Sequence, residues 1–435
     1  MPGKVNVMNS SGRVFPPDWT KIGYDDTPIS TLIGFDYAVS IKDNWDTSIV
    51  THTERYRDDK VLMYFPKNID TTNIQTADRM FQASDLEYID IDLSSARTAT
   101  AVFTDCSNLR GAVIHGLGNP DAPAGTLNNI ANMFSNCRSL VDVDLNLTEY
   151  STVLSAVNLF TDCWKLKEFE YNGTAAGIAR ISSLYNAFTN CYNLEKLKIY
   201  DALCEWIGCY AAGSQTEDGC LFDIDIGRTS PNGTQGAFRK AKIADNSAFH
   251  LRNFSNAQDI FREVIIKGSS SGIFAPLFYD PYTALNCSYT FADATCEKNN
   301  VEALIPSISN ANHMFDGFTF STSAGKIQAG YLNIDNATNL QNMFSNSNVR
   351  TLTGIAQRHI TAATNLSNMF YNSLNLDNGT LSDILTLLMT ASSYTGTKSL
   401  LAVGFTDSDV YPLSRFQSLP NNIWTTFTNA GWSYN

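Results

Sequence analysis

Apolar and polar residues alternate over short stretches that recur along most of the chain. After a leucine come two apolar positions separated by one polar position, as in Leu140 followed by Val143 and Leu145. The same phrase follows Leu194, with Leu197 and Ile199 at the apolar positions. A period of two is typical of a β-strand with one buried face. Each of these stretches is therefore predicted to be a short strand.

A phenylalanine stands before most of these leucines and gives the repeat a fixed point, here called the anchor. Successive anchors are roughly 22 to 31 residues apart, a period that marks a solenoid whose units stack to build a shared core. One step, from Phe188 to Phe238, is double, and residues 221–226 fill it with the strand half of the phrase alone. We therefore count about twelve copies. The anchors are Phe81, Phe103, Phe134, Phe160, Phe188, Phe238, Phe261, Phe291, Phe315, Phe344 and Phe370.

The segments between the predicted strands carry a different spacing. In residues 128–134 the apolar residues are three or four apart, which favours a helical turn or a short helix. The strand phrase, Leu-x-x-Leu-x-Leu, is the leucine-rich-repeat signature. The predicted fold is an α/β solenoid, a curved leucine-rich-repeat-like array with a parallel β-sheet on one face and short helices or turns on the other.

The two ends of such an array need covering, because an open terminal repeat exposes both core and strand edge. We expect an N-terminal arm and helical cap in residues 1–74, the solenoid in 75–375 and a C-terminal cap in 376–435. Residues 29–45 have amphipathic helical spacing and predict the first cap helix. Residues 381–389, and 423–427 before Gly431, predict helices of the second cap.

The repeat phrase Asn-Met-Phe-Ser-Asn-Cys-Arg-Ser-Leu at residues 132–140 resembles BspA-type leucine-rich repeats and related surface-protein repeats of bacteria and their viruses. The resemblance covers about residues 75 to 375. The flanking segments 37–46 and 427–432 resemble the ends of repeat proteins encoded in phage structural modules, notably those of Bacteroidales phages. The resemblance implies a virion protein for host attachment or particle assembly, such as a tail fibre, tail tip or capsid-decorating protein. It would be present in several copies and dock onto other virion proteins through its N-terminal region.

Composition and charge narrow the classes of partner. The chain has 435 residues, of which 43% are apolar and 17% charged, so it can bury a large core. Its net charge of −13 repels phosphate backbones, and nucleic acid is not an expected partner. No apolar signal-peptide region and no run of 18 apolar residues occurs, so neither export nor membrane insertion is predicted. Assembly into virions in the host cytoplasm fits this pattern, and a bacterial cell-surface adhesin or interaction protein with the same repeats is the alternative.

The nine cysteines are interpreted as structural. Four of them, Cys106, Cys137, Cys163 and Cys191, stand three residues after an anchor, where other repeats have serine or alanine. We expect buried free thiols that pack as small groups. The remaining cysteines lack the paired spacing of a zinc site, so no metal is predicted, although a site formed with His250 is an open alternative.

An asparagine recurs two residues before the anchor, at Asn132, Asn158, Asn186, Asn342 and Asn368. Repetition at a fixed phase is typical of a structural ladder. We interpret these amides as partners for backbone groups of the turns that burial would otherwise leave unsatisfied.

The polar positions between the buried strand residues point to the opposite face of the predicted sheet. This face is interpreted either as solvated surface or as a surface that binds a host glycan or protein. Its acidic pairs in neighbouring repeats would repel one another unless cations such as Ca²⁺ or the neighbouring lysines offset them. The candidate binding residues are Tyr88, Asp90, Asp142, Asp144, Glu168, Glu170, Lys196, Lys198, Asp223 and Asp225.

Catalytic motifs do not emerge from the sequence. The five histidines are scattered and fall in no metalloprotease, nucleophile-elbow or phosphate-loop pattern. The acidic pairs have the residue types that a glycosidase uses, but any acidic strand offers that geometry. A non-enzymatic protein without a cofactor is therefore expected.

Overall fold

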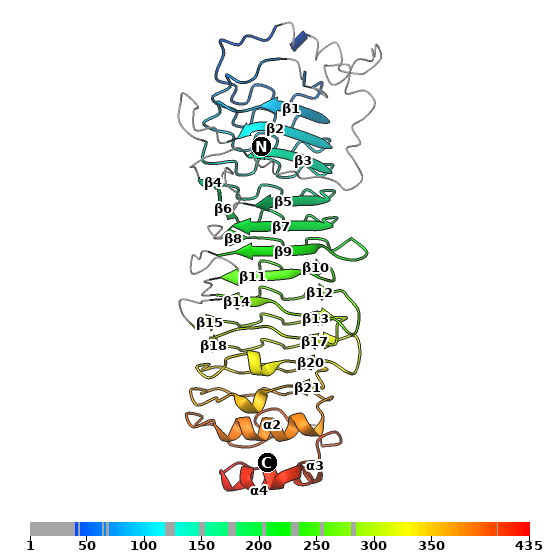
Figure 1. The fold of residues 1–435 in the computed structure, drawn as a ribbon, viewed down its shortest axis with the longest axis vertical. Coiled ribbons are helices and arrows are strands. Elements are labelled where there is room, and N and C mark those ends of the chain that lie inside the picture. The colour runs from blue at the N-terminus through cyan, green and yellow to red at the C-terminus, as the bar shows by residue number, and fades with distance from the viewer. Residues whose placement is uncertain are drawn as a thin grey trace. The chain divides into compact units, whose positions relative to one another are not determined.

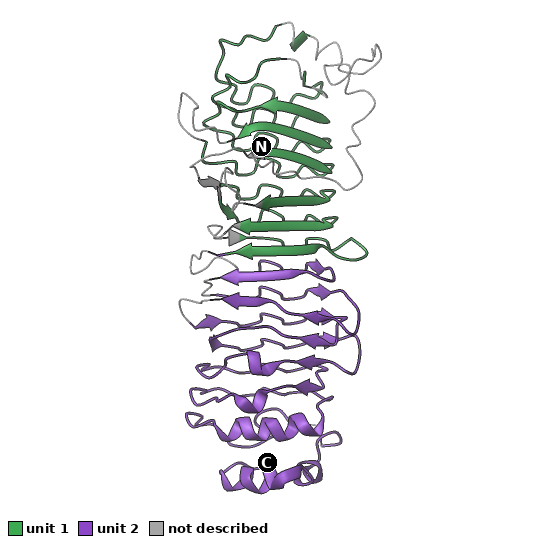
Figure 2. Cartoon of the chain, in the orientation of Figure 1, with its two compact units in different colours: residues 1–226 green, residues 227–435 purple. Residues whose placement is uncertain are grey.

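The structure is a computed structural model that describes residues 40–41, 44–62, 65–66, 69–117, 127–147, 153–172, 180–201, 206–227, 235–252, 256–279, 284–406 and 408–435. The chain forms two compact units, Met1–Ile226 and Gly227–Asn435 (Figure 2). Each is described by itself. The helix predicted for residues 29–45 falls mostly outside the described residues.

The first unit is built from short parallel strands (Figure 1). One sheet has the order β1-β2-β3, and another places β4, β6 and β8 side by side. A further set pairs β5 with β7 and β7 with β9. The bounds are β1 Tyr88–Asp92, β2 Gly111–Leu117, β3 Asp142–Leu147, β4 Val153–Ser155, β5 Glu168–Asn172, β6 Arg180–Leu184, β7 Lys196–Asp201, β8 Trp206–Ile207 and β9 Leu221–Ile226.

The second unit has shorter strands in the same parallel arrangement. The orders β10-β12-β16-β19 and β13-β17-β20-β21 make two sheets, and β11–β14 and β15–β18 pair as well. The bounds are β10 Lys242–Ile243, β11 Ala248–Arg252, β12 Ile265–Ile266, β13 Ile273–Phe274, β14 Leu277–Tyr279, β15 Leu285–Asn286, β16 Thr295–Cys296, β17 Asn300–Val301, β18 Ile308–Asn310, β19 Thr319–Phe320, β20 Lys326–Ile327 and β21 Thr351–Leu352. Helices follow as η2 Ala329–Tyr331, η3 Ile355–Gln357, α2 Asn378–Met389, α3 Leu413–Gln417, η4 Pro420–Asn422 and α4 Ile423–Asn429.

Each unit is a parallel-sheet β-solenoid, as the repeat predicted. A strand of one coil pairs with the equivalent strand of the next, for example Ile89 opposite Ala112 and Ala112 opposite Val143. The predicted inward positions are buried: Val143, Leu145, Leu197 and Ile199 are all 0% exposed. Stacking thus buries an apolar face that no single coil could cover.

The anchor phenylalanines form a column of stacked rings inside each unit. In the first unit the ring centroids of consecutive anchors from Phe81 to Phe188 are 5.2 to 5.8 Å apart. Tyr56 extends this column, with its ring 5.4 Å from that of Phe81. In the second unit the rings from Phe238 to Phe370 stack at 5.0 to 5.7 Å. In the repeat that lacks a phenylalanine, the Phe188 N–H bonds to the Gly208 carbonyl, which places buried Cys209 at the anchor position.

The segments around the anchors are turns. The short helices predicted there are not formed, and the other predicted possibility, a single turn, is what the structure has. Residues 131–136 form turns in which Asn132 and Asn136 have φ of 58° and 64°. A left-handed residue interrupts a right-handed helix. The N–H groups of Asn132, Phe134 and Asn136 instead bond to carbonyls of the next coil, at 2.7 to 3.0 Å. Coil-to-coil hydrogen bonding has therefore replaced helical hydrogen bonding.

Helices α2 and α4 lie where the spacing of residues 381–389 and 423–427 predicted helices. The Asp377 side chain accepts a hydrogen bond from the Thr380 N–H at 2.8 Å and so caps the start of α2. Gly431, with φ of 86°, follows the end of α4, where a left-handed residue commonly ends a helix.

Candidate functional site

The predicted outward positions of β1 to β3 lie in two rows across the sheet. Tyr88, Gly111 and Asp142 stand opposite one another in the first row. The Tyr88 ring lies against Gly111, where an added Cβ would be 3.3 Å from the tyrosine Cδ1. Tyr88 is 7% exposed and Asp144, in the second row, 8%. This face is therefore partly covered, and is less open than solvent-facing strand positions were expected to be.

A histidine that the sequence did not single out joins this face. His115 Nε2 lies 2.8 Å from Asp90 Oδ1 on the neighbouring strand. The hydrogen bond that His115 donates to Asp90 raises the pKa of the imidazole, and partial burial opposes this effect. The charges of Asp90, Asp92 and Asp144 raise the pKa further. The acidic side chains of this sheet thus favour a cationic imidazole among them.

The outward positions of β5, β7 and β9 alternate in charge from strand to strand. Glu170, Lys198 and Asp223 stand opposite one another in a single row. Lys196 forms an ion pair with Glu170 across the same pair of strands. Opposite charges on neighbouring strands offset the repulsion that the acidic pairs alone would produce.

Asp223 also accepts a hydrogen bond from the Tyr200 hydroxyl. Burial raises the pKa of Tyr200 above its usual range, and the hydrogen bond and charge of Asp223 add to the effect. Tyr200 was not among the predicted residues. Its place after the second outward lysine in the alternation of β7 is the signal that would have identified it.

Two details of this arrangement differ from the spacing counted along the sequence. Lys196 is the second residue after Leu194 and Asp223 the second after Leu221, so the leucine spacing placed these two side chains opposite one another. In the structure Leu221 stands opposite Lys196, and Asp223 stands opposite Lys198. The acidic pairs of β3 and β5 were expected one strand apart in one sheet, but β3 pairs with β2 and β5 with β7, in different sheets. Register depends on how each corner is turned, which the leucine spacing alone does not specify.

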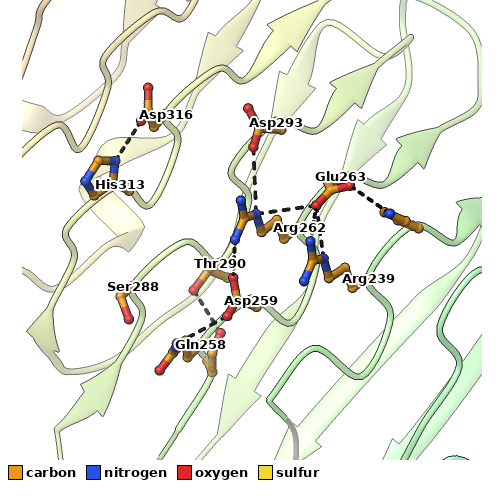
Figure 3. Close-up of polar contacts among 12 residues, drawn as sticks. Arg239, Gln258, Asp259, Arg262, Glu263, Ser288, Thr290, Asp293, His313 and Asp316 are labelled. Carbon is orange, nitrogen blue, oxygen red and sulfur yellow. Dashed lines mark hydrogen bonds and ion pairs between the residues drawn. The ribbon is translucent and has the colours of Figure 1, made fainter.

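In the second unit a charged network lies on the turns that flank the anchors (Figure 3). Arg239 Nε donates to Glu263 Oε1 at 3.0 Å, and Lys240 Nζ lies 3.5 Å from Oε2 of the same carboxylate. Arg262 contacts three carboxylates: Glu263 at 3.6 Å, Asp259 at 3.3 Å and Asp293 at 3.7 Å. Its guanidinium therefore links its own coil to the next.

Burial alone would raise the pKa of Glu263, but hydrogen bonding to Arg239 and the charges of Arg239, Lys240 and Arg262 outweigh it. The pKa of this carboxyl is therefore below its ordinary value. Glu263 stays ionised at neutral pH and offsets the positive charges of Arg239, Lys240 and Arg262 around it.

An aromatic column continues from the same network. The Arg262 guanidinium carbon lies 5.1 Å from the Tyr289 ring centroid, and the Tyr289 and His313 rings stack at 4.6 Å. His313 Nδ1 lies 2.7 Å from Asp316 Oδ2, while Nε2 accepts from the Asn342 amide at 3.1 Å. His313 thus occupies, two residues before the anchor Phe315, the position that asparagine holds in other repeats.

Left-handed residues flank the anchors and explain the recurring asparagines. The position two before the ring has positive φ in Arg79, Ala101, Asn132, Asn158, Asn186, Asp259, Tyr289, His313, Asn342 and Asn368. The position two after it does so in Ala83, Asp105, Asn136, Asp162, Asn190, Lys240, Glu263, Asp293, Asn346 and Asn372. Asparagine and aspartate tolerate this conformation better than most residues. The Asn158 amide donates to the Asn132 side chain of the preceding coil at 3.1 Å, so these residues also link coils.

The asparagines two residues before the anchor had been expected to bind backbone groups of the turns. In the structure, asparagines five residues before the anchor make such contacts. Five residues before the anchor, the Asn310 side chain accepts the N–H of Asn312 at 3.1 Å. The same contact recurs at 2.8 to 3.2 Å in other coils. This repetition was visible in the sequence and was missed. The residues are Asn129, Asn256, Asn286, Asn310, Asn339 and Asn365.

The four cysteines that follow an anchor are buried and free, as predicted. Cys106, Cys137, Cys163 and Cys191 are 0% exposed and unpaired, and burial raises the pKa of Cys106 to about 12. Cys204 lies outside the described residues. Within the described ranges no group of three or more His, Cys, Asp or Glu side chains is arranged to hold a metal ion.

Comparison with known proteins gives one family match. Residues 285–393 match a family described as "Mycoplasma protein of unknown function, DUF285". No curated protein and no solved structure matches the chain. The family match and the parallel-sheet solenoid fit a repeat protein of the BspA type. Among the residues described, none of the helices has the length and apolar character needed to cross a membrane.

Proposed function

We propose that the protein is a non-enzymatic interaction protein that presents rows of polar side chains on its outer strands and turns. The observation that carries the proposal is the fixing of these rows by contacts between consecutive coils. Glu170 with Lys196, and Glu263 with Arg239, are examples in the two units. Side chains held in this way form a preorganised surface, which lowers the entropy lost on binding.

The partner in this proposal is a host-cell surface, and the protein is a virion component such as a tail fibre, tail tip or capsid-decorating protein. The resemblance of segments 37–46 and 427–432 to phage repeat proteins supports this version. The alternative is a bacterial cell-surface adhesin or interaction protein. The description of the matching family as a Mycoplasma protein favours that alternative, because it places such repeats in a cellular organism.

We also propose that about twelve repeats make up the array and that the C-terminal helices close its last sheet. Supporting this, the Leu352 N–H bonds to Thr380 Oγ1 at 3.2 Å and Thr351 Oγ1 to Asp377 Oδ2 at 2.9 Å. The Thr380 side chain thus satisfies a backbone N–H of β21 that a further strand would otherwise bind, and Asp377 adds a side-chain contact to the same strand.

The first experiment measures binding of the purified, fluorescently labelled protein to cells of the host or organism that carries the gene. The double variant Lys198→Gln, Asp225→Asn removes the charge from two outward side chains and changes their size little. We expect saturable binding by the wild type and weaker binding by the variant. Lys326→Gln, an exposed lysine of β20, is the control. Absence of saturable binding by the wild type would reject an attachment role.

The second experiment distinguishes the two locations. Mass spectrometry of purified particles should detect the chain if it is a virion protein, and labelling of intact cells should detect it if it is an adhesin. In the virion case, deletion of residues 1–25 should abolish incorporation into particles while the protein still folds. Detection in neither fraction would contradict both versions.

A further inference from the structure

Three side chains form a row outside the first unit, at the corners that precede β3, β5 and β7. They are Arg138, Trp164 and Tyr192, here called the corner row. The Arg138 guanidinium carbon lies 4.5 Å from the Trp164 ring centroid. The Trp164 and Tyr192 centroids are 6.2 Å apart, with the ring planes inclined by 44°. Each residue directly follows one of the buried thiols, so the stacked core sets the spacing of the row.

The two aromatic side chains of the row each carry one polar group, the indole N–H of Trp164 and the hydroxyl of Tyr192. Trp164 remains 37% exposed although its indole is a large apolar group. Buried tryptophan and tyrosine usually find a hydrogen-bond partner for their N–H and O–H groups. Within the described part of the chain, neither Trp164 Nε1 nor the Tyr192 hydroxyl makes a hydrogen bond. Both groups can therefore donate to a ligand.

Neighbouring side chains hold the row in place. Arg138 Nε donates to Asn136 Oδ1 at 2.7 Å, and Asn136 Nδ2 donates to Asp105 Oδ1 at 2.7 Å. The Asn193 amide donates to the backbone carbonyl of Trp164 at 2.7 Å. The stacked guanidinium and these amide contacts limit the movement of the ring. Rigid aromatic groups lose little conformational entropy on binding.

Polar groups accompany the row two positions earlier in each coil. Asp105 with Asn136, and Asp162 with Asn190, are hydrogen-bonded pairs at 2.7 and 2.8 Å on consecutive turns. Carboxylate and amide oxygens accept hydrogen bonds from hydroxyl groups, and the amide and guanidinium N–H groups donate to them. The corner thus combines exposed aromatic surface with both kinds of hydrogen-bonding group.

We propose that the corner row binds a neutral polysaccharide, with one coil for each sugar along the chain; this inference rests on the proposed attachment function. The C–H faces of sugar rings pack on aromatic surfaces, while their hydroxyls bind amides, carboxylates and guanidinium groups. Coils recur at the strand spacing of ~4.8 Å, which matches the scale of one sugar residue in an extended chain. The net charge of −13 opposes a polyanion.

The small size of the exposed aromatic surface favours a glycan over a protein partner. Arginine, tryptophan and tyrosine are also common hot spots of protein interfaces, but a standard interface buries about 800 Å² on each partner around an apolar centre. The other exposed large apolar residues described in the first unit are Ile49, Val61 and Tyr185, none of which belongs to the corner row. A narrow polar-flanked row suits a thin hydroxyl-rich chain.

The test is a glycan array with the purified full chain, followed by calorimetry with soluble forms of the neutral polysaccharides that bind. We expect Trp164→Ala to weaken binding by about tenfold or more, the size of one lost aromatic contact. Trp164→Phe should retain part of the affinity because it keeps a ring and loses only the N–H donor. Tyr371→Ala is the matched control, since Tyr371 is 45% exposed and lies in the second unit.

Cell binding separates failure of this inference from failure of the attachment function. Periodate oxidation of the cells, which destroys sugar rings with vicinal hydroxyls, should abolish binding, and protease treatment should not. Binding that survives periodate and is lost after protease treatment would identify a protein receptor and overturn the glycan proposal alone. Failure of the wild type to bind any neutral glycan, or equal affinities of the folded Trp164→Ala and Tyr371→Ala variants, would overturn it as well.

Discussion

The Cys137 thiol donates a hydrogen bond to the carbonyl oxygen of Phe103, 3.0 Å away in the preceding coil. The contact recurs from Cys106 to Phe81, from Cys163 to Phe134 and from Cys191 to Phe160, at 2.9 to 3.2 Å. In the second unit Ser373 makes the equivalent bond to the Phe344 carbonyl. At these five positions the small side chain three residues after the anchor therefore fills space in the core and also links one coil to the next.

The closed environment of Cys137 predicts how the position responds to changes in size. Cys137→Leu should lower the free energy of unfolding by about 1–3 kcal/mol, because the side chain is fully buried and extra methyl groups have no room. Cys137→Ser, which keeps the size and the donor, should be the mildest change. Urea unfolding of the three proteins checks the order, and a leucine variant as stable as the serine variant would contradict tight packing here.

Left-handed backbone at an alanine predicts a stabilising glycine. Ala83 has φ of 58°, a conformation that costs an ordinary residue roughly 1–2 kcal/mol and glycine very little. Ala83→Gly should therefore raise the free energy of unfolding, by up to about 1 kcal/mol once the greater freedom of glycine in the unfolded chain is included. Ala402→Gly, at a position without positive φ, should lower it. Thermal unfolding of both variants measures the difference, and the same sign for both would refute the explanation.

The Asp90–His115 pair predicts a loss of stability on the alkaline side. Because the folded state raises the pKa of His115 above its ordinary value of 6.5, the stabilising contribution is complete below pH 6.5. It disappears as the pH rises through the folded pKa. His115 is half-exposed, so the effect should be only a few tenths of a kcal/mol. NMR titration of the imidazole gives the pKa, and Asp90→Asn should return it toward 6.5.

His52 predicts the opposite dependence. Burial lowers the pKa of this imidazole, and its contacts fit the neutral form: Nε2 lies 2.9 Å from the Ile49 carbonyl, and the Arg55 guanidinium lies 2.9 Å from Nδ1. The folded state binds this proton less well than the unfolded state, so stability should fall as the pH drops from 6.5 through the folded pKa. His52→Gln should remove that part of the acid sensitivity. An unchanged slope between pH 7 and pH 5 would exclude His52 as its source.

Glu263 predicts a salt-dependent contribution in the second unit. Glu263→Gln leaves Arg239, Lys240 and Arg262 close together with less compensating charge, so stability should fall by roughly 0.5–1 kcal/mol at low ionic strength. The loss should shrink in ~1 M salt, where screening reduces repulsion between the cations. Glu302→Gln serves as a carboxylate control outside the network. Equal losses at both salt concentrations would indicate lost packing in place of lost charge compensation.

Some of the candidate surface followed from the repeat and some did not. Glu170 and Lys198 were placed on the outward side because a strand alternates its two faces, which is a local property. The pairing of Lys198 with Asp223, and the addition of His115 and Tyr200, depended on which strands lie side by side and in which register. Those relations join residues on different coils. The spacing of one coil carries no information about them.

The sequence by itself determined that the chain forms parallel-sheet solenoids with anchor phenylalanines and free thiols inside. Such a result follows from periodicity, because a face that recurs every coil must be buried against its neighbour. Only the tertiary structure decided that the anchors sit in left-handed turns instead of helices. Local spacing around Asn132 allowed either, and the turn wins because its N–H groups bond to the next coil, a partner that a helical segment considered alone does not have.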